Sequence, residues 1–103
     1  MDKIEGLKEI LARDPKNSFA RYGMAMELAG RGETVAALVE FDTLLANDPD
    51  YTAGFFMSAQ TLATAGRTSE AIARLKAGIA SAKRSGNHHA LSEMQSMLDE
   101  LDR

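Results

Sequence analysis

The sequence has 103 residues, of which 45% are apolar and 26% charged, a composition typical of one folded domain. Its formal net charge of -3 argues against nucleic-acid binding, which usually needs a basic surface. Because the chain contains no cysteine, disulfides and thiolate chemistry are excluded. No apolar run approaches the ~20 residues of a membrane span, and no secretory signal follows Met1, so we expect a cytoplasmic protein without a membrane partner.

Six helices are predicted from the spacing of apolar residues and from the residues that interrupt it. In chain order, their approximate ranges are 2–13, 18–30, 34–47, 51–65, 68–84 and 88–101. In the first helix, one face carries Ile4, Leu7, Ile10 and Leu11. The residues expected in the core or between helices are Met24, Phe41, Phe55, Met57, Leu62 and Leu75, with Met94 and Met97 docking the last helix.

Proline and glycine residues indicate where the helices end. Pro15 and Pro49 cannot donate a hydrogen bond to the preceding turn, so each ends a helix. Gly32 and Gly66 suit the left-handed conformation after a helix end, where a side chain would clash.

The helix starts are predicted at residues whose side chains can accept a hydrogen bond from the first turn. We expect Thr34 and Thr68 to do so through their hydroxyl groups. Asn17 and Asn87 are expected to cap their helices through the side-chain amide.

The sequence also repeats itself with a period of 34 residues. The pairs at this spacing include Pro15/Pro49, Gly32/Gly66 and Ala37/Ala71. When residues 18–49 are laid over residues 52–83, seven of the 32 positions are identical. The same shift lays residues 1–15 over residues 35–49, as the second half of a truncated repeat.

This pattern resembles the tetratricopeptide-repeat (TPR) family, whose signature has Trp, Leu-Gly and Tyr in one helix and Ala, Phe and Pro in the next. Ala37, Phe41 and Pro49 match the second helix of one copy, and Phe55 takes the Trp position of the following copy. Small residues that would let paired helices approach closely are Ala25, Ala37, Ala59 and Ala71.

Three residues depart from the signature. Arg21 stands where the first copy should have its aromatic residue. Leu44 occupies a usually small position, whereas Gly78 keeps a small residue in the second copy. Lys83 replaces the closing proline, so that helix is expected to run on towards Gly86.

The resemblance implies an all-α fold, a right-handed superhelical solenoid of antiparallel helix pairs with about six helices. We expect one domain over residues 1–103. Its predicted parts are a half repeat (1–15), two repeats (18–51 and 52–84) and a capping helix (87–103).

The resemblance further implies that the first helix of each repeat lines a concave groove for a partner protein. The predicted groove residues are Phe19, Tyr22, Met26, Ala29, Ala53, Phe56, Gln60 and Ala63, a surface that is apolar and nearly uncharged. As an alternative, Phe19, Tyr22 and Phe56 pack between neighbouring first helices. Tyr22 and Met26 stand where carboxylate-binding relatives place Lys and Asn, which argues against recognition of a C-terminal carboxylate.

No catalytic pattern is found, and no cofactor is expected. His88 and His89 are adjacent, so they point to different helix faces. His89 and Glu93 are four residues apart and could share an ion, but a third metal ligand is missing.

The predicted function is therefore that of a protein-interaction module, not an enzyme, which binds a peptide or helix of a partner in its groove. The alternative is a structural protein that associates with itself. The half repeat at residues 1–13 has no first helix of its own, and an incompletely covered apolar face is typical of an interface.

Overall fold

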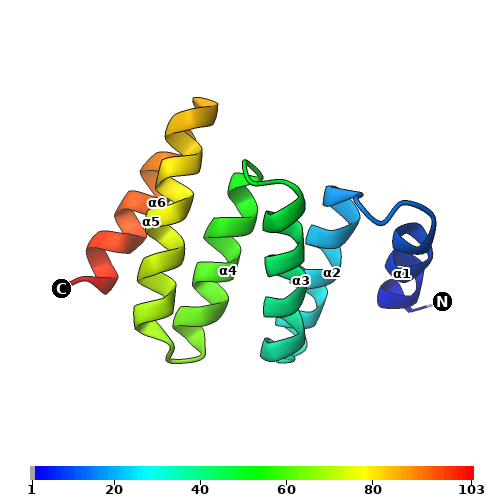
Figure 1. Cartoon of the computed structure of the whole chain (residues 1–103). Helices are drawn as coiled ribbons and strands as arrows, with labels where there is room; N and C mark the ends of the chain where they lie inside the picture. The colour runs from blue at the N-terminus through cyan, green and yellow to red at the C-terminus, as the bar shows by residue number, and fades with distance from the viewer. Residues whose placement is uncertain (1) are drawn as a thin grey trace. The chain divides into compact units, whose positions relative to one another are not determined.

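The computed structural model describes residues 2–103, and within this range all regular structure is helical (Figure 1). The six helices are α1 (Lys3–Arg13), α2 (Ser18–Gly30), α3 (Thr34–Asn47), α4 (Thr52–Thr64), α5 (Thr68–Ser85) and α6 (His88–Leu101). Each predicted helix boundary agrees with these bounds to within one residue. The predicted all-α class and helix count are therefore confirmed.

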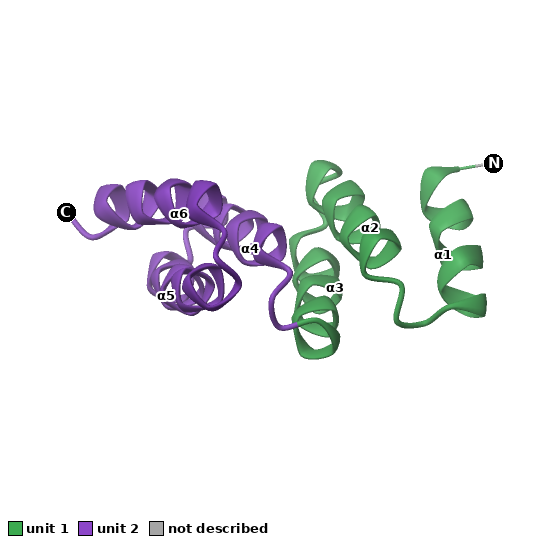
Figure 2. Ribbon diagram, turned by 90° about the horizontal axis from the view of Figure 1, so that it is seen from above, with its two compact units in different colours: residues 1–48 green, residues 49–103 purple. Residues whose placement is uncertain are grey.

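The chain divides between Asp48 and Pro49 into two compact units (Figure 2). Helices α1 to α3 make up the first unit and α4 to α6 the second. The predicted division of the chain into a half repeat, two repeats and a cap stays a prediction.

In the first unit, α2 and α3 form an antiparallel hairpin and α1 packs against α2 (Figures 1 and 2). Phe41 and Leu44 of α3 are almost completely buried. Between α1 and α2 the buried side chains are Ile4, Leu11, Ala20 and Met24, with Leu7 and Leu28 packed against them.

In the second unit, α4 and α5 form the hairpin, and α6 packs mainly against α5 and also contacts α4. Its fully buried side chains include Leu75 and Met94. Of the two methionines expected to dock α6, Met94 is confirmed, whereas Met97 is only half-buried. Met57, expected in the core, is half-buried. The expected close approach of paired helices is supported in both units, since the four alanines expected there have no exposed surface: Ala25, Ala37, Ala59 and Ala71.

The turns between paired helices depend on glycine, as predicted. Gly32 and Gly66 have φ values of 77° and 78°, in the left-handed region that disfavours a side chain. After Gly32, the backbone N–H of Glu33 donates to the Leu28 carbonyl at 3.0 Å. The equivalent bond after Gly66 joins Arg67 N to the Leu62 carbonyl at 2.9 Å.

The expected threonine caps are wrong. The capping positions are Glu33 and Arg67, and neither makes a side-chain cap hydrogen bond. The compact turn after each glycine leaves only Glu33 or Arg67 before the helix, so Thr34 and Thr68 are the first helical residues, as in the predicted ranges, and not caps.

The asparagine caps are confirmed. Asn17 Oδ1 accepts a hydrogen bond from Ala20 N at 2.9 Å, and Asn87 Oδ1 accepts one from Ala90 N at 3.1 Å. Each bond satisfies one of the backbone donors that a helix leaves free at its start.

Two further comparisons with the sequence pattern concern α1 and α5. Ile10, predicted on the buried face of α1, is 45% exposed, because α1 packs against α2 on one side only. The helix that lacks its closing proline does run on, as expected. With 18 residues, α5 is longer than the 14-residue α3, and it ends at Gly86 in the left-handed conformation.

Candidate functional site

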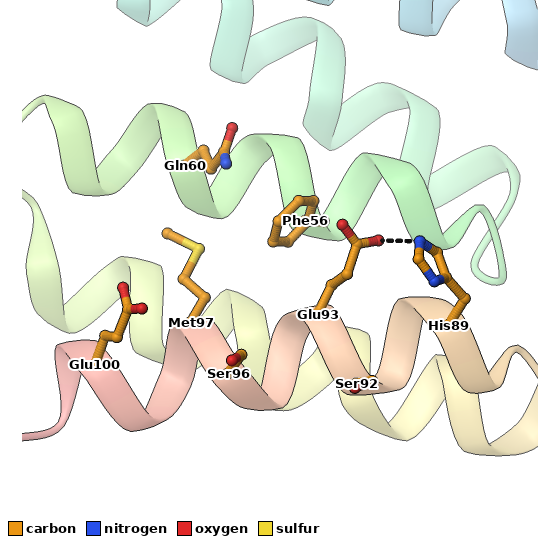
Figure 3. A pocket seen from close by; sticks show the side chains of 8 residues that line it. All are labelled: Phe56, Gln60, His89, Ser92, Glu93, Ser96, Met97 and Glu100. Atoms are coloured by element: carbon orange, nitrogen blue, oxygen red, sulfur yellow. Dashed lines mark ion pairs between the residues drawn. The ribbon is translucent and has the colours of Figure 1, made fainter.

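An open hollow of about 490 Å³ lies along α4 and α6 of the second unit (Figure 3). Phe56 and Gln60 of α4 are one helical turn apart and line one side. Three successive turns of α6 supply the other lining residues, which are His89, Ser92, Glu93, Ser96, Met97 and Glu100. The hollow therefore follows the direction of the two helices.

The start of α6 is fixed to α4 by one asparagine. Asn87 accepts the cap hydrogen bond of α6 through Oδ1, and its Nδ2 donates to Thr52 Oγ1 at 2.9 Å. Thr52 is the first residue of α4 and is buried. Both helices that line the hollow are thus held at the same end by the Asn87 side chain.

The opposite face of α6 is fixed by Met94, which has no exposed surface. A Cβ atom built on Gly78 of α5 would lie 2.5 Å from Met94 Sδ, so these two residues are in close contact. With Met94 turned into the core, the neighbouring turns of α6 present Glu93 and Met97 to the hollow (Figure 3).

The hollow combines two apolar side chains with polar and acidic groups. Phe56 and Met97 are half-buried, and they face each other across it (Figure 3). His89 Nε2 lies 3.2 Å from Glu93 Oε1, and the His89 side chain is 87% exposed. Among the described residues, no cluster of three His, Cys, Asp or Glu side chains could hold a metal ion.

Two predicted groove residues of α4, Phe56 and Gln60, line this hollow. Ala53 and Ala63 lie on the same helix, but they do not line it. Phe56 thus faces an open hollow while much of its surface is covered by the protein.

The predicted groove residues of α2 belong to the first unit. Phe19 is 80% exposed. Its packing between neighbouring first helices stays an untested alternative, because α2 and α4 belong to different units. Tyr22 packs edge-on against Phe41 of α3, with ring centroids 6.5 Å apart. Met26 and Ala29 are half-buried.

The sequence prediction missed the contribution of α6. A shift of 34 residues from α4 fails here, because the longer α5 makes α6 begin 36 residues after α4 (88 - 52 = 36). Adding 36 to the groove positions Ala53, Phe56 and Gln60 gives His89, Ser92 and Ser96, and all three line the hollow. The signal that could have found them is the Asn87 cap, which marks the true start of α6.

One sequence relative covers nearly the whole chain. It is a TPR repeat-containing protein of Pseudomonas aeruginosa, 30% identical over 100 residues, which span 97% of this chain and 95% of the relative. The chain belongs to the TPR family. No family model matches the sequence, in agreement with departures from the TPR signature such as Arg21 and Lys83.

Solved structures agree with the TPR assignment. A tetratricopeptide-repeat domain protein of Salinibacter ruber is 30% identical, with a TM-score of 0.79 over 84% of this chain and 88% of that one. A Bordetella parapertussis protein is 26% identical, with a TM-score of 0.85 over 100% of this chain and 90% of its own.

The type III secretion translocator chaperone SycD of Yersinia enterocolitica shares the fold. Its TM-score is 0.86 at 16% identity, over 96% of this chain and 69% of SycD.

For the TPR chain itself, none of the helices in the described range 2–103 is long and apolar enough to cross a membrane.

Proposed function

We propose that this TPR protein is an interaction module that binds a peptide or helix of a partner protein along α4 and α6. The observation that supports this function is the open hollow of the second unit, in which Phe56 and Met97 are only half-buried. Aromatic and methionine side chains make large, adaptable apolar contacts and are common at protein interfaces. The polar residues around them would satisfy the backbone or side chains of a bound segment.

The shape of the hollow favours a polypeptide over a small molecule. A small-molecule site usually encloses most of its ligand, whereas this hollow is open along its length. A helix laid along a groove is a frequent mode of peptide recognition and needs apolar anchors spaced by helical turns. Phe56 and Gln60, one turn apart on α4, lie alongside the path that such a bound helix would follow.

We propose the α2 residues Phe19, Tyr22, Met26 and Ala29, together with Ala63 of α4, as further contact positions for the partner. Phe19 supports this proposal best, because an 80% exposed phenylalanine gains apolar burial only when another surface covers it. We also propose that the protein is not an enzyme, that it needs no cofactor and that it is located in the cytoplasm.

Site-specific photo-crosslinking tests the proposed binding surface. The chain has no cysteine, so Ser96→Cys places a single thiol in the hollow for a benzophenone label. Ala80→Cys is the matched control, since Ala80 is exposed on α5 and does not line the hollow. Both labelled proteins are irradiated in an extract of the native host, with and without excess unlabelled protein.

The expected result is an adduct with the same protein in repeated experiments, formed at position 96, suppressed by the unlabelled competitor and absent at position 80. Equal adducts at both positions, or none at position 96, would exclude the hollow as the binding surface.

A second candidate function, self-association, is favoured by exposed apolar residues of the first unit. On α3, Val35 and Val39 are one turn apart and 73% and 57% exposed. Ile10 of α1 is 45% exposed. Sedimentation velocity over a hundred-fold concentration range tests this candidate, and a persistent monomer would remove it.

A further inference from the structure

The charged side chains that line the hollow include two carboxylates and no Lys or Arg. Glu93 and Glu100 supply these carboxylates, and His89 is the one residue of the lining that can carry positive charge. Glu93 is in contact with His89, whereas Glu100 makes no ion pair or hydrogen bond within the described residues. The hollow thus presents negative charge that the protein only partly balances.

The basic residues of the unit lie mainly on a different helix. Between His88 and Asp102 there is no Lys or Arg, and Arg103 follows only after the end of α6, while α5 carries Arg74, Lys76, Lys83 and Arg84. Lys83 lines a separate hollow with Asp99. Arg84 is paired with Asp50 at 2.9 Å.

The two carboxylates and the methionine form a row on α6. Met97 follows Glu93 by four residues and precedes Glu100 by three, so all three share one helical face. At ~1.5 Å per residue, the seven residues from Glu93 to Glu100 span about 10.5 Å, or two turns. The row reads acidic, apolar, acidic, and Phe56 of α4 faces it from the other side (Figure 3).

We propose that the occupant of this hollow is a basic amphipathic helix of a partner protein. Its matching residues would be an apolar side chain between Phe56 and Met97, and a Lys or Arg on either side of it, about two turns apart. This assignment of the partner class rests on the proposed peptide-binding role of the hollow. Charge complementarity supports it, since an acidic segment would meet Glu93 and Glu100 without a compensating cation.

The apolar and charged contacts would play different parts in this complex. Exposed ion pairs contribute little affinity one by one and are weakened by salt. Burial of Phe56 and Met97 would therefore provide most of the binding free energy. Glu93 and Glu100 would select basic partners over neutral and acidic ones.

Selection from a display library of 16-residue helical peptides tests the charge preference, because the library offers basic, neutral and acidic segments in competition. The full chain is immobilised as the parent, as Glu93→Gln/Glu100→Gln and as Phe56→Ala. The matched control is Glu70→Gln/Asp102→Asn, which removes the same charge from positions that do not line the hollow. Circular dichroism of each variant verifies that it stays helical.

The parent and the control are expected to enrich peptides with an apolar residue flanked by Lys or Arg about seven positions apart. The glutamine double variant should lose at least half of the basic enrichment and keep the apolar one. For a selected peptide, its dissociation constant should rise about three- to ten-fold and depend less on salt than that of the parent.

The outcomes separate the partner class from the proposed function. Peptides that bind the parent through Phe56 but are neutral or acidic would overturn the basic-partner assignment and leave the peptide-binding function standing. Equal basic enrichment on the parent and on the glutamine double variant would overturn it as well. No enrichment on the parent, or enrichment untouched by Phe56→Ala, would overturn both.

Discussion

Gly78 of α5 lies so close to Phe55 of α4 that a Cβ atom on the glycine would be 2.6 Å from Phe55 Cβ. The same atom would lie 2.5 Å from Met94 Sδ of α6. Three helices of the second unit therefore meet at a position where a side chain of any size is excluded. The hollow depends on this meeting point, because the docking of Met94 orients α6.

Gly78→Ala is expected to lower the free energy of unfolding by about 1–3 kcal/mol, because the added methyl group overpacks a closed core. Urea denaturation followed by circular dichroism measures the change. Gly30→Ala is the matched control, since a Cβ there meets nothing within 4 Å. It should be neutral or raise stability by up to about 1 kcal/mol, and an unchanged Gly78→Ala would contradict the close packing.

At the equivalent place in the first unit, a larger residue replaces the glycine and an arginine replaces the aromatic residue. The 34-residue period equates Phe55 with Arg21 and Gly78 with Leu44. Leu44 is 1% exposed and lines one small cleft with Arg21. Arg21 extends past it, donating to Glu40 Oε2 at 2.9 Å and to the Pro15 carbonyl at 2.8 Å.

Because an aromatic ring and a leucine compete for this space, Arg21→Phe is expected to destabilise the chain by about 1–3 kcal/mol. Leu44→Gly alone should cost about 3–6 kcal/mol from lost burial and helix propensity. The double variant should be less destabilised than the sum of the single variants by about 1 kcal/mol or more. Urea denaturation of all four proteins gives this coupling, and strict additivity would contradict the volume exchange.

Asn87→Ala removes both the cap of α6 and the bond to Thr52, and a loss of about 2 kcal/mol is expected. Hydrogen exchange should be fastest in the first turn of α6. Asn17→Ala removes a cap of similar length, 2.9 Å, and should cost about 1 kcal/mol. Equal effects of the two substitutions would show that the bond to Thr52 adds no stability.

The start of α1 is tied to the end of α2 by Asp2 and Arg31, whose nearest side-chain atoms are 2.6 Å apart. The hydrogen bond from Arg31 lowers the pKa of the Asp2 carboxyl below its ordinary value. Its stabilising effect is therefore present above the unfolded-state pKa, near 4, and is lost as pH falls through the folded-state pKa. The difference in stability between the parent and Asp2→Asn should shrink below about pH 4. The difference in stability between the parent and Arg31→Met should shrink in the same way. Urea denaturation at pH 7 and pH 3 measures both differences.

Phe19→Ser is expected to change the free energy of unfolding by less than about 0.5 kcal/mol, since its side chain is 80% exposed. If α2 contacts the partner as proposed, the yield of the position-96 adduct should nevertheless fall. Phe41→Ser, at a residue with no exposed surface, should cost about 3–5 kcal/mol instead. Undiminished adduct with Phe19→Ser would remove α2 from the binding surface.

The helices could be predicted from the sequence because local signals and the repeat agree. Pro15, Pro49, Gly32 and Gly66 mark helix ends by backbone constraints that no distant contact alters. The threonine caps could not be predicted in the same way. Whether Thr34 lies before or inside its helix depends on how tightly the turn closes after Gly32, which involves the Leu28 carbonyl of the previous helix.

The candidate site was only half predictable. Phe56 and Gln60 follow from the family register, but the α6 residues depend on the length of α5. The Asn87 cap correctly predicts the start of α6, but the family register assigns groove positions by the 34-residue period, which α6 does not follow. Exposure of Phe19 and Ile10 depends on which neighbours surround each helix, and the pattern of one helix does not contain that information.

The extra turn of α5 has a consequence for engineering. A designed 34-residue consensus module spliced after α5 in the family register would enter its first helix two residues out of step, about 200° around the helix axis. Its hydrophobic stripe would then point to solvent and its binding face into the core. A working graft must keep the Gly86–Asn87 junction, or remove the two extra residues before the first added residue.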